Sequence, residues 1–184
     1  MKKVFSIFLL LIFSLSLRSQ IYTAKQGATS ISFYSEAPLE NIEAVSKVAT
    51  IVLQSTTNDF QVRIPIQSFK FKNGLMEEHF NENYMESDKF PNAEFKGKII
   101  DQIDYKRDGE TKVNVLGNMT IHGVTKEVTT EGIITKTGEE IKLFTKFKIR
   151  VADYGIEVPS MYVKNIAEEV EVTFNSVLEP FKKK

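Results

Sequence analysis

The chain has 184 residues, of which 42% are hydrophobic and 26% are charged, with 24 basic side chains, 24 acidic side chains and no cysteine. This length suits one domain with a buried core, and the hydrophobic fraction excludes a disordered chain. A net charge of zero argues against nucleic-acid binding, which needs a clustered excess of Lys and Arg. The lack of cysteine excludes disulfides, thiolate metal sites and cysteine nucleophiles.

Residues 1–19 have the form of a secretory signal peptide. Two lysines precede an apolar run from Val4 to Leu17, and Ser19 provides a small residue at a predicted cleavage site before Gln20. The run is shorter than the roughly 20 apolar residues that span a bilayer, so we expect no integral membrane span after cleavage. Cleavage leaves 21 basic and 24 acidic side chains, a net charge of −3. We therefore expect a periplasmic or secreted bacterial protein with a single domain over residues 20–184.

Apolar side chains recur at every second position, which is the period of a strand with one buried and one solvated face. The alternation is clearest at Phe60, Val62, Ile64 and Ile66, at odd positions from Ile141 to Val151, and from Val170 to Phe174. Further strands are predicted over residues 29–35, 45–55, 93–104, 111–122 and 125–135, with turn signals at Asn58-Asp59, Asp108-Gly109, His122-Gly123 and Thr137-Gly138.

About eight antiparallel strands at hairpin-like spacing predict an all-β sandwich or a closed β-barrel. The barrel is favoured, because long strands in an open sheet would leave exposed edges. One segment departs from this period, since apolar residues there follow one stripe of a helix: Leu75, Met76, His79, Phe80, Asn83 and Tyr84. We predict one short flanking α-helix between residues 74 and 91.

Two segments carry a more specific pattern. Residues 76–97 place His79 on the predicted helix, followed by Lys89-Phe90-Pro91 and a strand that opens Ala93-Glu94-Phe95. Residues 117–128 contain the run Thr120-Ile121-His122-Gly123-Val124-Thr125-Lys126. In order and spacing the two segments resemble the YceI-like family, whose Asp-aromatic-Gly turn is matched by Asp153-Tyr154-Gly155. A tryptophan that the family often carries near the mature N-terminus is replaced by Ile21-Tyr22.

The resemblance implies a lipocalin-like antiparallel barrel that binds and carries an amphiphilic, isoprenoid-like lipid of the polyprenyl or prenyl-quinone type, without catalysis. Periodicity alone favours a filled core over a cavity, and the resemblance reverses that preference. Aromatic and branched walls suit a long apolar chain. We predict that this chain contacts Phe60, Val62, Ile64, Ile66, Leu75, Met76, His79, Phe80, Phe95, Ile121, His122, Phe147, Ile149 and Phe174.

His79 and His122 are the only histidines. A zinc site is disfavoured, because catalytic zinc normally has three protein ligands and no HExxH pattern is present. A histidine beside a turn can donate to a backbone carbonyl, so we predict a structural role or a contact with the ligand's headgroup. No metal and no cofactor are expected.

Motifs of the common enzyme classes do not occur in the sequence, which has no G-x-S-x-G, no phosphate-binding glycine loop and no dinucleotide fingerprint. Asp101 and Asp104 lie three residues apart on a strand end, so they point to opposite faces and are interpreted as solvated. No catalytic residue is predicted. Two alternatives stay open: an envelope enzyme that uses His79 and His122 on a quinone or isoprenoid, and a structural or interaction barrel with a filled core.

A stripe of basic residues occupies the outward positions of one predicted strand, at Lys142, Lys146, Lys148 and Arg150. Glu169 and Glu171 occupy outward positions on the last strand, so we predict ion pairs across the two strands rather than a binding site for nucleic acid. The oligomeric state stays open, with a homodimer among the alternatives.

Overall fold

The computed structural model describes residues 20–36, 41–157 and 168–182. The predicted signal peptide, residues 1–19, lies outside the described residues. Among the residues that are described, no helix is long and apolar enough to cross a membrane.

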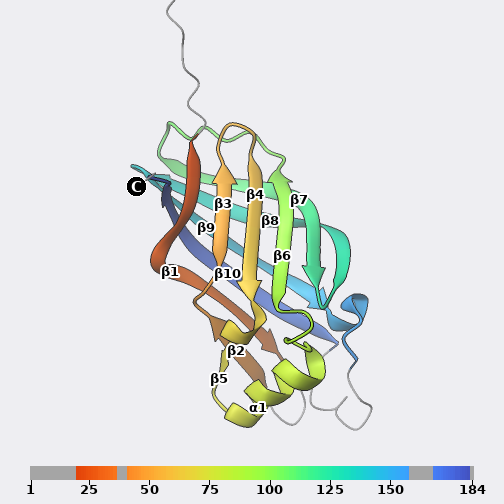
Figure 1. Ribbon diagram of the computed structural model, residues 1–184. Coiled ribbons are helices and arrows are strands. Elements are labelled where there is room, and N and C mark those ends of the chain that lie inside the picture. Colours follow the sequence, from red (N-terminus) through yellow and green to blue (C-terminus); the bar gives the residue numbers. More distant parts are fainter. Residues whose placement is uncertain (1–19, 37–40, 158–167, 183–184) are drawn as a thin grey trace, which may run out of the picture.

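Eight antiparallel strands close into a barrel (Figure 1). Around the ring they follow the order β1, β3, β4, β6, β7, β8, β9 and β10, and β10 pairs again with β1. The predicted lipocalin-like, all-β barrel is therefore confirmed. The strand bounds are β1 (Ile21–Ser35), β3 (Thr50–Gln54), β4 (Asp59–Pro65), β6 (Asn92–Ile99), β7 (Gly109–Ile121), β8 (Val124–Thr137), β9 (Glu140–Arg150) and β10 (Glu169–Pro180).

Strand β1 is longer than predicted and is shared between two neighbours. Its first residues pair with β3, whereas its last residues pair with β2 (Ile42–Ser46), which pairs in turn with β5 (Lys70–Phe71). The single strand predicted over residues 45–55 is therefore wrong, because β2 and β3 are separate. The Ser46 hydroxyl accepts a hydrogen bond from the Val48 amide at 3.1 Å and turns the chain between them.

The strand predicted over residues 93–104 also ends early, at Ile99. The chain leaves the ladder there because the Asp101 carboxylate accepts hydrogen bonds from the backbone and side-chain amides of Asn114 in β7. The Asn58 side chain donates to the Asp101 carbonyl at 3.1 Å and holds the same loop from β4's side. Asp101 is therefore a structural anchor for the end of β6.

The predicted turns place residues in the left-handed region of backbone conformation. Between β7 and β8, His122 and Gly123 have φ values of 50° and 74°, as a two-residue hairpin of type I′ requires. Asn58 has a φ of 61° and Gly138 a φ of 57°, at the other predicted turns. These turns join neighbouring antiparallel strands and fix their registers.

The flanking helix is present but shorter than predicted. Helix α1 (Gly74–His79) begins after Asn73, whose side chain accepts a hydrogen bond from the Leu75 amide at 2.9 Å, and it continues as one π-helical segment (Phe80–Tyr84). Because the π-turn shifts the helical register, the predicted stripe is broken. No residue of α1 is buried, and Leu75 is 57% exposed. The helix lies at one end of the barrel, near β2 and β5 (Figure 1).

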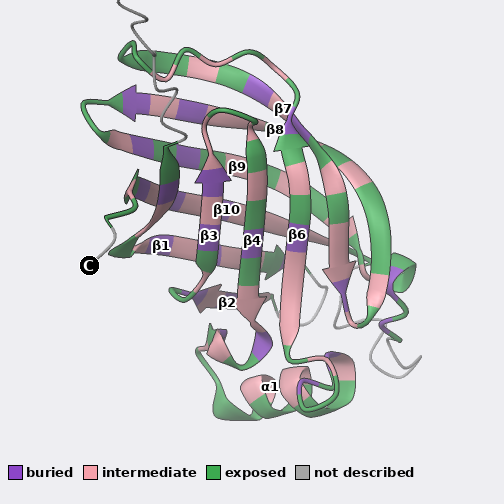
Figure 2. Ribbon diagram, turned by 45° about the horizontal axis from the view of Figure 1, so that its top comes forward, coloured by how far each residue is buried: buried purple, intermediate pink, exposed green. Residues whose placement is uncertain are grey.

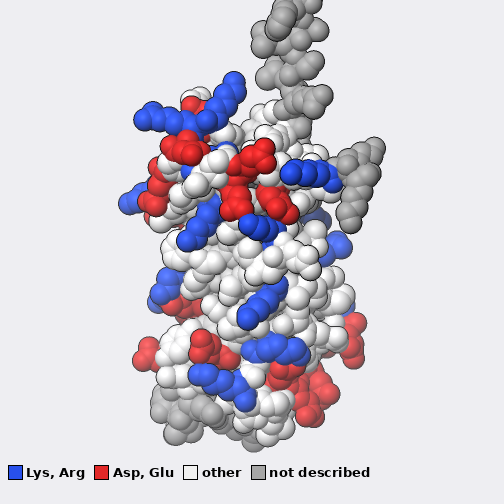
Figure 3. Space-filling view, turned by 90° about the vertical axis from the view of Figure 1, so that its left-hand side faces the viewer, with Lys and Arg blue, Asp and Glu red and all other residues white. Residues whose placement is uncertain are grey.

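Basic and acidic side chains pair on the outer surface as predicted. Lys146 lies 2.7 Å from Glu171 and Lys148 lies 3.2 Å from Glu169, across the β9–β10 ladder. On the face that Figure 3 shows, the two signs of charge are intermixed. Such pairs are exposed and contribute little to stability, but they keep the outer face of these strands solvated.

Burial alternates along the strands, as the bands of colour in Figure 2 show. Successive side chains of a strand point to opposite faces, so every second one faces the barrel interior. Gly97 and Gly117 are register partners at inward positions of β6 and β7. A Cβ on Gly117 would lie 2.6 Å from the Lys96 carbonyl oxygen and 2.8 Å from the tip of the Phe95 ring. The glycine pair therefore leaves the space that the Phe95 ring occupies.

Replacing Gly117 with alanine should lower the free energy of unfolding by about 2–3 kcal/mol, because the added methyl group overlaps main chain and the Phe95 ring. Urea unfolding of the purified protein measures this loss. The control is Gly74→Ala, where an added Cβ meets nothing within 4 Å, so the change should stay within about 0.5 kcal/mol. Equal losses in the two variants would contradict the packing role of the glycine pair.

Candidate functional site

The interior of the barrel contains a cavity of about 240 Å³. For comparison, an engineered apolar cavity of about 150 Å³ stays dry and binds benzene. Side chains from every strand of the ring except β3 contribute to the lining, together with Ile66 and Phe69 after β4 and Phe80 and Met85 around the π-helical segment. The lining is overwhelmingly aliphatic and aromatic.

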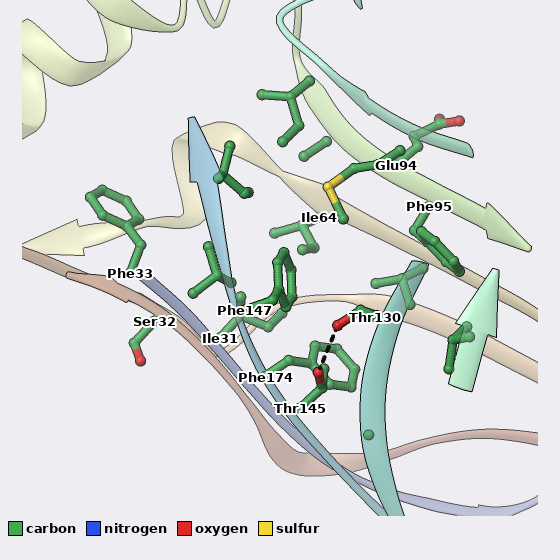
Figure 4. A pocket seen from close by; sticks show the side chains of 18 of the residues that line it. Ile31, Ser32, Phe33, Ile64, Glu94, Phe95, Thr130, Thr145, Phe147 and Phe174 are labelled. Atoms are coloured by element: carbon green, nitrogen blue, oxygen red, sulfur yellow. Dashed lines mark hydrogen bonds between the residues drawn. The ribbon is translucent and has the colours of Figure 1, made fainter. Parts of the chain in front are cut away.

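Aromatic rings from five strands point into this cavity. Figure 4 shows Phe33 of β1, Phe95 of β6, Phe147 of β9 and Phe174 of β10, and Phe60 of β4 completes the set. Each ring occupies an inward position of its strand, so the period of two places all of them on the same side of the sheet. The Phe60 and Phe95 rings lie 6.1 Å apart and form one continuous aromatic wall.

The end of the cavity near α1 is covered by an aromatic cluster. The Phe80 ring lies 5.4 Å from that of Phe33 and 5.9 Å from that of Phe69, and Phe71 contacts both Phe33 and Phe80. The four rings come from four segments of the chain, namely β1, the loop after β4, β5 and the π-helical segment. Phe80 thus fixes the helical segment on the barrel end.

The opposite end of the barrel is filled. Leu53, Ile141 and Leu178 have no exposed surface and do not line the cavity. Tyr22 stacks on Tyr105 with ring centroids 6.4 Å apart, and the Tyr105 hydroxyl donates to the Asn58 side chain at 2.9 Å. Burial raises the pKa of the Tyr105 phenol, which therefore stays neutral. The barrel combines a packed end and a hollow end.

Most of the residues predicted to contact a ligand line this cavity. They are Phe60, Val62, Ile64, Ile66, Phe80, Phe95, Ile121, Phe147, Ile149 and Phe174. Leu75, Met76, His79 and His122 lie outside the lining, because the π-turn directs α1 away from the interior and His122 occupies the β7–β8 turn. Whether the lining residues contact a ligand stays a prediction.

Sequence reasoning missed several lining residues, although the pattern contained them. Ile31 and Phe33 alternate within the predicted strand at 29–35, and Val113, Val115 and Met119 alternate within that at 111–122. The same period of two that selected β4 and β9 would have selected these side chains. Phe69 and Met85 lie in irregular segments, where no period identifies them.

His122 has a structural role. Its Nδ1 lies 3.3 Å from the Tyr154 carbonyl oxygen and its Nε2 lies 2.9 Å from a Glu86 carboxylate oxygen, while the Phe90 ring packs 4.6 Å away. Both polar partners are acceptors, so only a doubly protonated ring donates to both at once. His122 therefore joins the β7–β8 turn to the segment that carries Phe80 and Met85, two residues of the cavity lining.

Few polar groups accompany the lining. The Glu94 carboxylate binds Lys96 and Arg63 on the outer surface, at 2.8 Å and 2.7 Å, and the hydrogen bonds from Lys96 and then Arg63 hold its pKa below the ordinary value. It is therefore an ionised surface group and not a proton donor for the cavity. The described part of the chain holds no group of three or more side chains suited to a metal ion.

Comparison with known proteins gives one consistent answer. A family model described as YceI-like domain matches residues 22–178. A polyisoprenoid binding domain from Saccharophagus degradans, implicated in plant cell wall breakdown, is similar in structure with a TM-score of 0.75 at 17% identity, covering 87% of this chain and 98% of that one. Burkholderia cenocepacia BcnA gives a TM-score of 0.68 at 18% identity, covering 81% of this chain and 95% of that one.

A Campylobacter jejuni YCEI protein gives a TM-score of 0.55 at 19% identity, covering 74% of this chain and 81% of that one. No curated protein matches the sequence. At these sequence identities the solved structures show that the fold is shared, whereas the family model identifies the family.

The bond between Glu86 and His122 predicts a pH dependence of stability. Hydrogen bonding to His122, helped by the nearby Lys89 ammonium, lowers the pKa of Glu86 from its ordinary value of 4.5. The ionised carboxylate therefore stabilises the fold above pH 4.5, and this contribution is lost as the pH falls through the lowered pKa. Glu86→Gln should be less stable than the wild type at neutral pH, and the two proteins should converge in acid.

Urea unfolding at a series of pH values measures this convergence. The control places Glu86→Gln in a His122→Asn background, since asparagine tolerates the positive φ at that position. There the effect of Glu86→Gln should shrink to the weaker contribution of Lys89, which lies 3.6 Å from Glu86. An undiminished effect in that background would show that His122 is not the relevant partner.

Proposed function

We propose, because the chain belongs to the YceI-like family, that it binds and carries an amphiphilic, isoprenoid-like lipid in the hollow end of its barrel without chemical turnover. The observation that supports this most directly is the cavity itself. Its aliphatic and aromatic lining is continuous from Phe33 near α1 to Val113 and Ile134 deeper in the barrel. Such a lining favours a long apolar chain, because this ligand gives up no hydrogen bonds to water when it is buried there.

The energetics favour a prenyl chain over a polar ligand. Each methylene that leaves water for this lining contributes roughly 0.8 kcal/mol, so affinity grows with the buried length of the chain. Polar ligands would lose hydrogen bonds to water and find few replacements, because the inward positions of most lining strands carry Ile, Val, Phe or Met. Binding would then discriminate by length and shape of the chain.

The location that we propose is the periplasm or the cell exterior. The support is the sequence of residues 1–19, with its lysines, apolar run and small residue before Gln20. An isoprenoid chain is poorly soluble in the aqueous space between membranes. A water-soluble barrel that hides such a chain would serve as a carrier or a buffer there.

The two alternatives receive less support. An enzyme that acts through His79 and His122 would need these side chains at the ligand, but neither lines the cavity, and His122 is held by Glu86 and Tyr154. A structural barrel would be filled throughout, as the end near Tyr22 is. The hollow end favours the carrier.

Native mass spectrometry of protein purified from its own host tests the proposal. We expect a co-purified lipid, or uptake of an added polyprenol or prenyl quinone at one molecule per barrel. Repeated preparations without bound lipid and without uptake would refute lipid carriage. Chemical conversion of the bound lipid by the pure protein would refute the non-catalytic role alone.

Filling part of the cavity should weaken lipid binding without unfolding the barrel. Val172 lies at an inward position of β10 beside Phe33 and Phe147, so Val172→Phe places a ring in the hollow end and should reduce affinity at least about tenfold. Val177→Phe is the matched control, because it makes the same change on the same strand at an outward position that does not line the cavity. Fluorescence competition with a prenyl alcohol measures both. Equal affinities would place the ligand outside the cavity.

A further inference from the structure

The ladder between β8 and β9 is incomplete. Register pairs run from Thr137 and Glu140 only as far as Ile133 and Phe144. Beyond that point β8 continues to pair with β7, and β9 continues to pair with β10, but the two strands share no further register pair. The barrel wall therefore divides into what we call the β8–β9 fork, formed by residues 124–132 of β8 and 145–150 of β9.

The wide end of the fork is closed by side chains. Val124 packs with Ile121, Tyr154 and Ile156 in a second small core, and His122 binds the Tyr154 carbonyl. The fork is thus a window bounded by the ladder at one end and by this core at the other. Phe147 and Ile149 line the cavity along its β9 edge and remain partly exposed.

Two hydroxyl groups lie at the narrow end of this window. Thr130 is the register partner of the buried Val115, and Thr145 lies between the inward Leu143 and Phe147, so both face the interior and line the cavity. Their Oγ1 atoms lie 3.3 Å apart (Figure 4). The Thr145 hydroxyl donates to the Glu131 carbonyl at 2.6 Å, so the Thr130 hydroxyl is the donor to Thr145 or to that same carbonyl, which lies 3.4 Å from it. Both hydroxyl protons are therefore used within the protein, and the two oxygens can accept from a ligand donor.

The other polar residues around the cavity face outward. Ser32 lies between the inward Ile31 and Phe33, and Figure 4 shows its hydroxyl turned away from the cavity. Glu94 lies between the inward Ala93 and Phe95 and binds cations on the outer surface. Among the described residues that line the cavity, the inward-facing hydroxyls are those of Thr130 and Thr145.

We propose that the polar end of the bound lipid lies in the β8–β9 fork, hydrogen-bonded to Thr130 and Thr145, and reaches solvent through the side of the barrel. This inference rests on the proposed function. The apolar chain would extend from the fork toward Phe33 and Phe80. An amphiphile placed in this way buries its chain against the apolar lining and keeps its polar end beside Thr130 and Thr145, which are partly exposed.

The fork is suited to a neutral polar end. A buried phosphate or carboxylate needs a cation within reach, because an unpaired charge in an apolar site is costly. Along β9, Lys146 and Lys148 occupy outward positions and bind Glu171 and Glu169. On β8, Lys126 has the same parity as Thr130, but it lies four residues away toward the hairpin and is exposed. Because both threonine protons are used within the protein, the fork offers acceptors to a ligand, and an alcohol, which donates, matches it best.

Farnesol and farnesene provide the test, because they share one chain and differ in the hydroxyl. For Thr130→Val/Thr145→Val we expect the affinity for farnesol to fall roughly three- to tenfold, since the hydrogen bonds to the alcohol are lost. The affinity for farnesene should stay unchanged, which also reports that the barrel is folded. Thr130→Ser/Thr145→Ser keeps both hydroxyls and should retain the wild-type preference for farnesol.

Thr125→Val is the matched control. Its hydroxyl also pairs across strands, with Thr120 at 2.8 Å, but it lies near the exposed hairpin and does not line the cavity. The ratio of the two affinities should not change in this variant. Wild-type binding of both ligands with an unchanged ratio in the double valine variant would overturn the fork assignment alone. Failure of the wild type to bind either ligand would overturn the proposed function as well.

Discussion

Pairing between the first and the last strand is the constraint on which the barrel depends. From Thr29 to Tyr34, β1 runs antiparallel to β10, and a buried hydrogen bond of 2.9 Å between the hydroxyls of Thr29 and Ser176 lies within this seam. Closure pairs the free edges that long strands would otherwise expose, except along the β8–β9 fork. It also commits the inner face of all eight strands to one enclosed space, which must be filled by side chains or left for a ligand.

The two ends of the barrel resolve this choice differently. At the end of the seam where Ala24 pairs with Leu178, the side chains of Leu53, Ile141 and Leu178 pack without exposed surface, and the stacked Tyr22 and Tyr105 cover them. Toward α1 the inward side chains are as apolar but do not meet across the interior. This end needs a separate cover, and the segment with Phe80 and Met85 supplies it, held by the aromatic cluster and by the bond between His122 and Glu86.

Strands and turns that depend only on residues close in sequence could be predicted from local patterns. The alternation at Phe60–Ile66 and the His122-Gly123 turn define strands and a hairpin by themselves, so the fold class followed from the sequence, and the resemblance identified its family. The sequence could not reveal the π-turn at Phe80, because it arises from packing of that ring against Phe33 and Phe69. Nor does periodicity report that the β8–β9 ladder stops at Phe144, since both strands keep their alternation beyond it.

The division into a packed end and a hollow end bears on how such a barrel evolves. Side chains of the packed end touch neighbours on all sides, so a change in their size creates a void or a clash and costs stability. Around the hollow end a side chain such as Val172 or Ile149 faces open space, and a change in its size meets less resistance. Substitutions at the hollow end can therefore change which ligand the barrel binds, while the residues of the packed end preserve the fold.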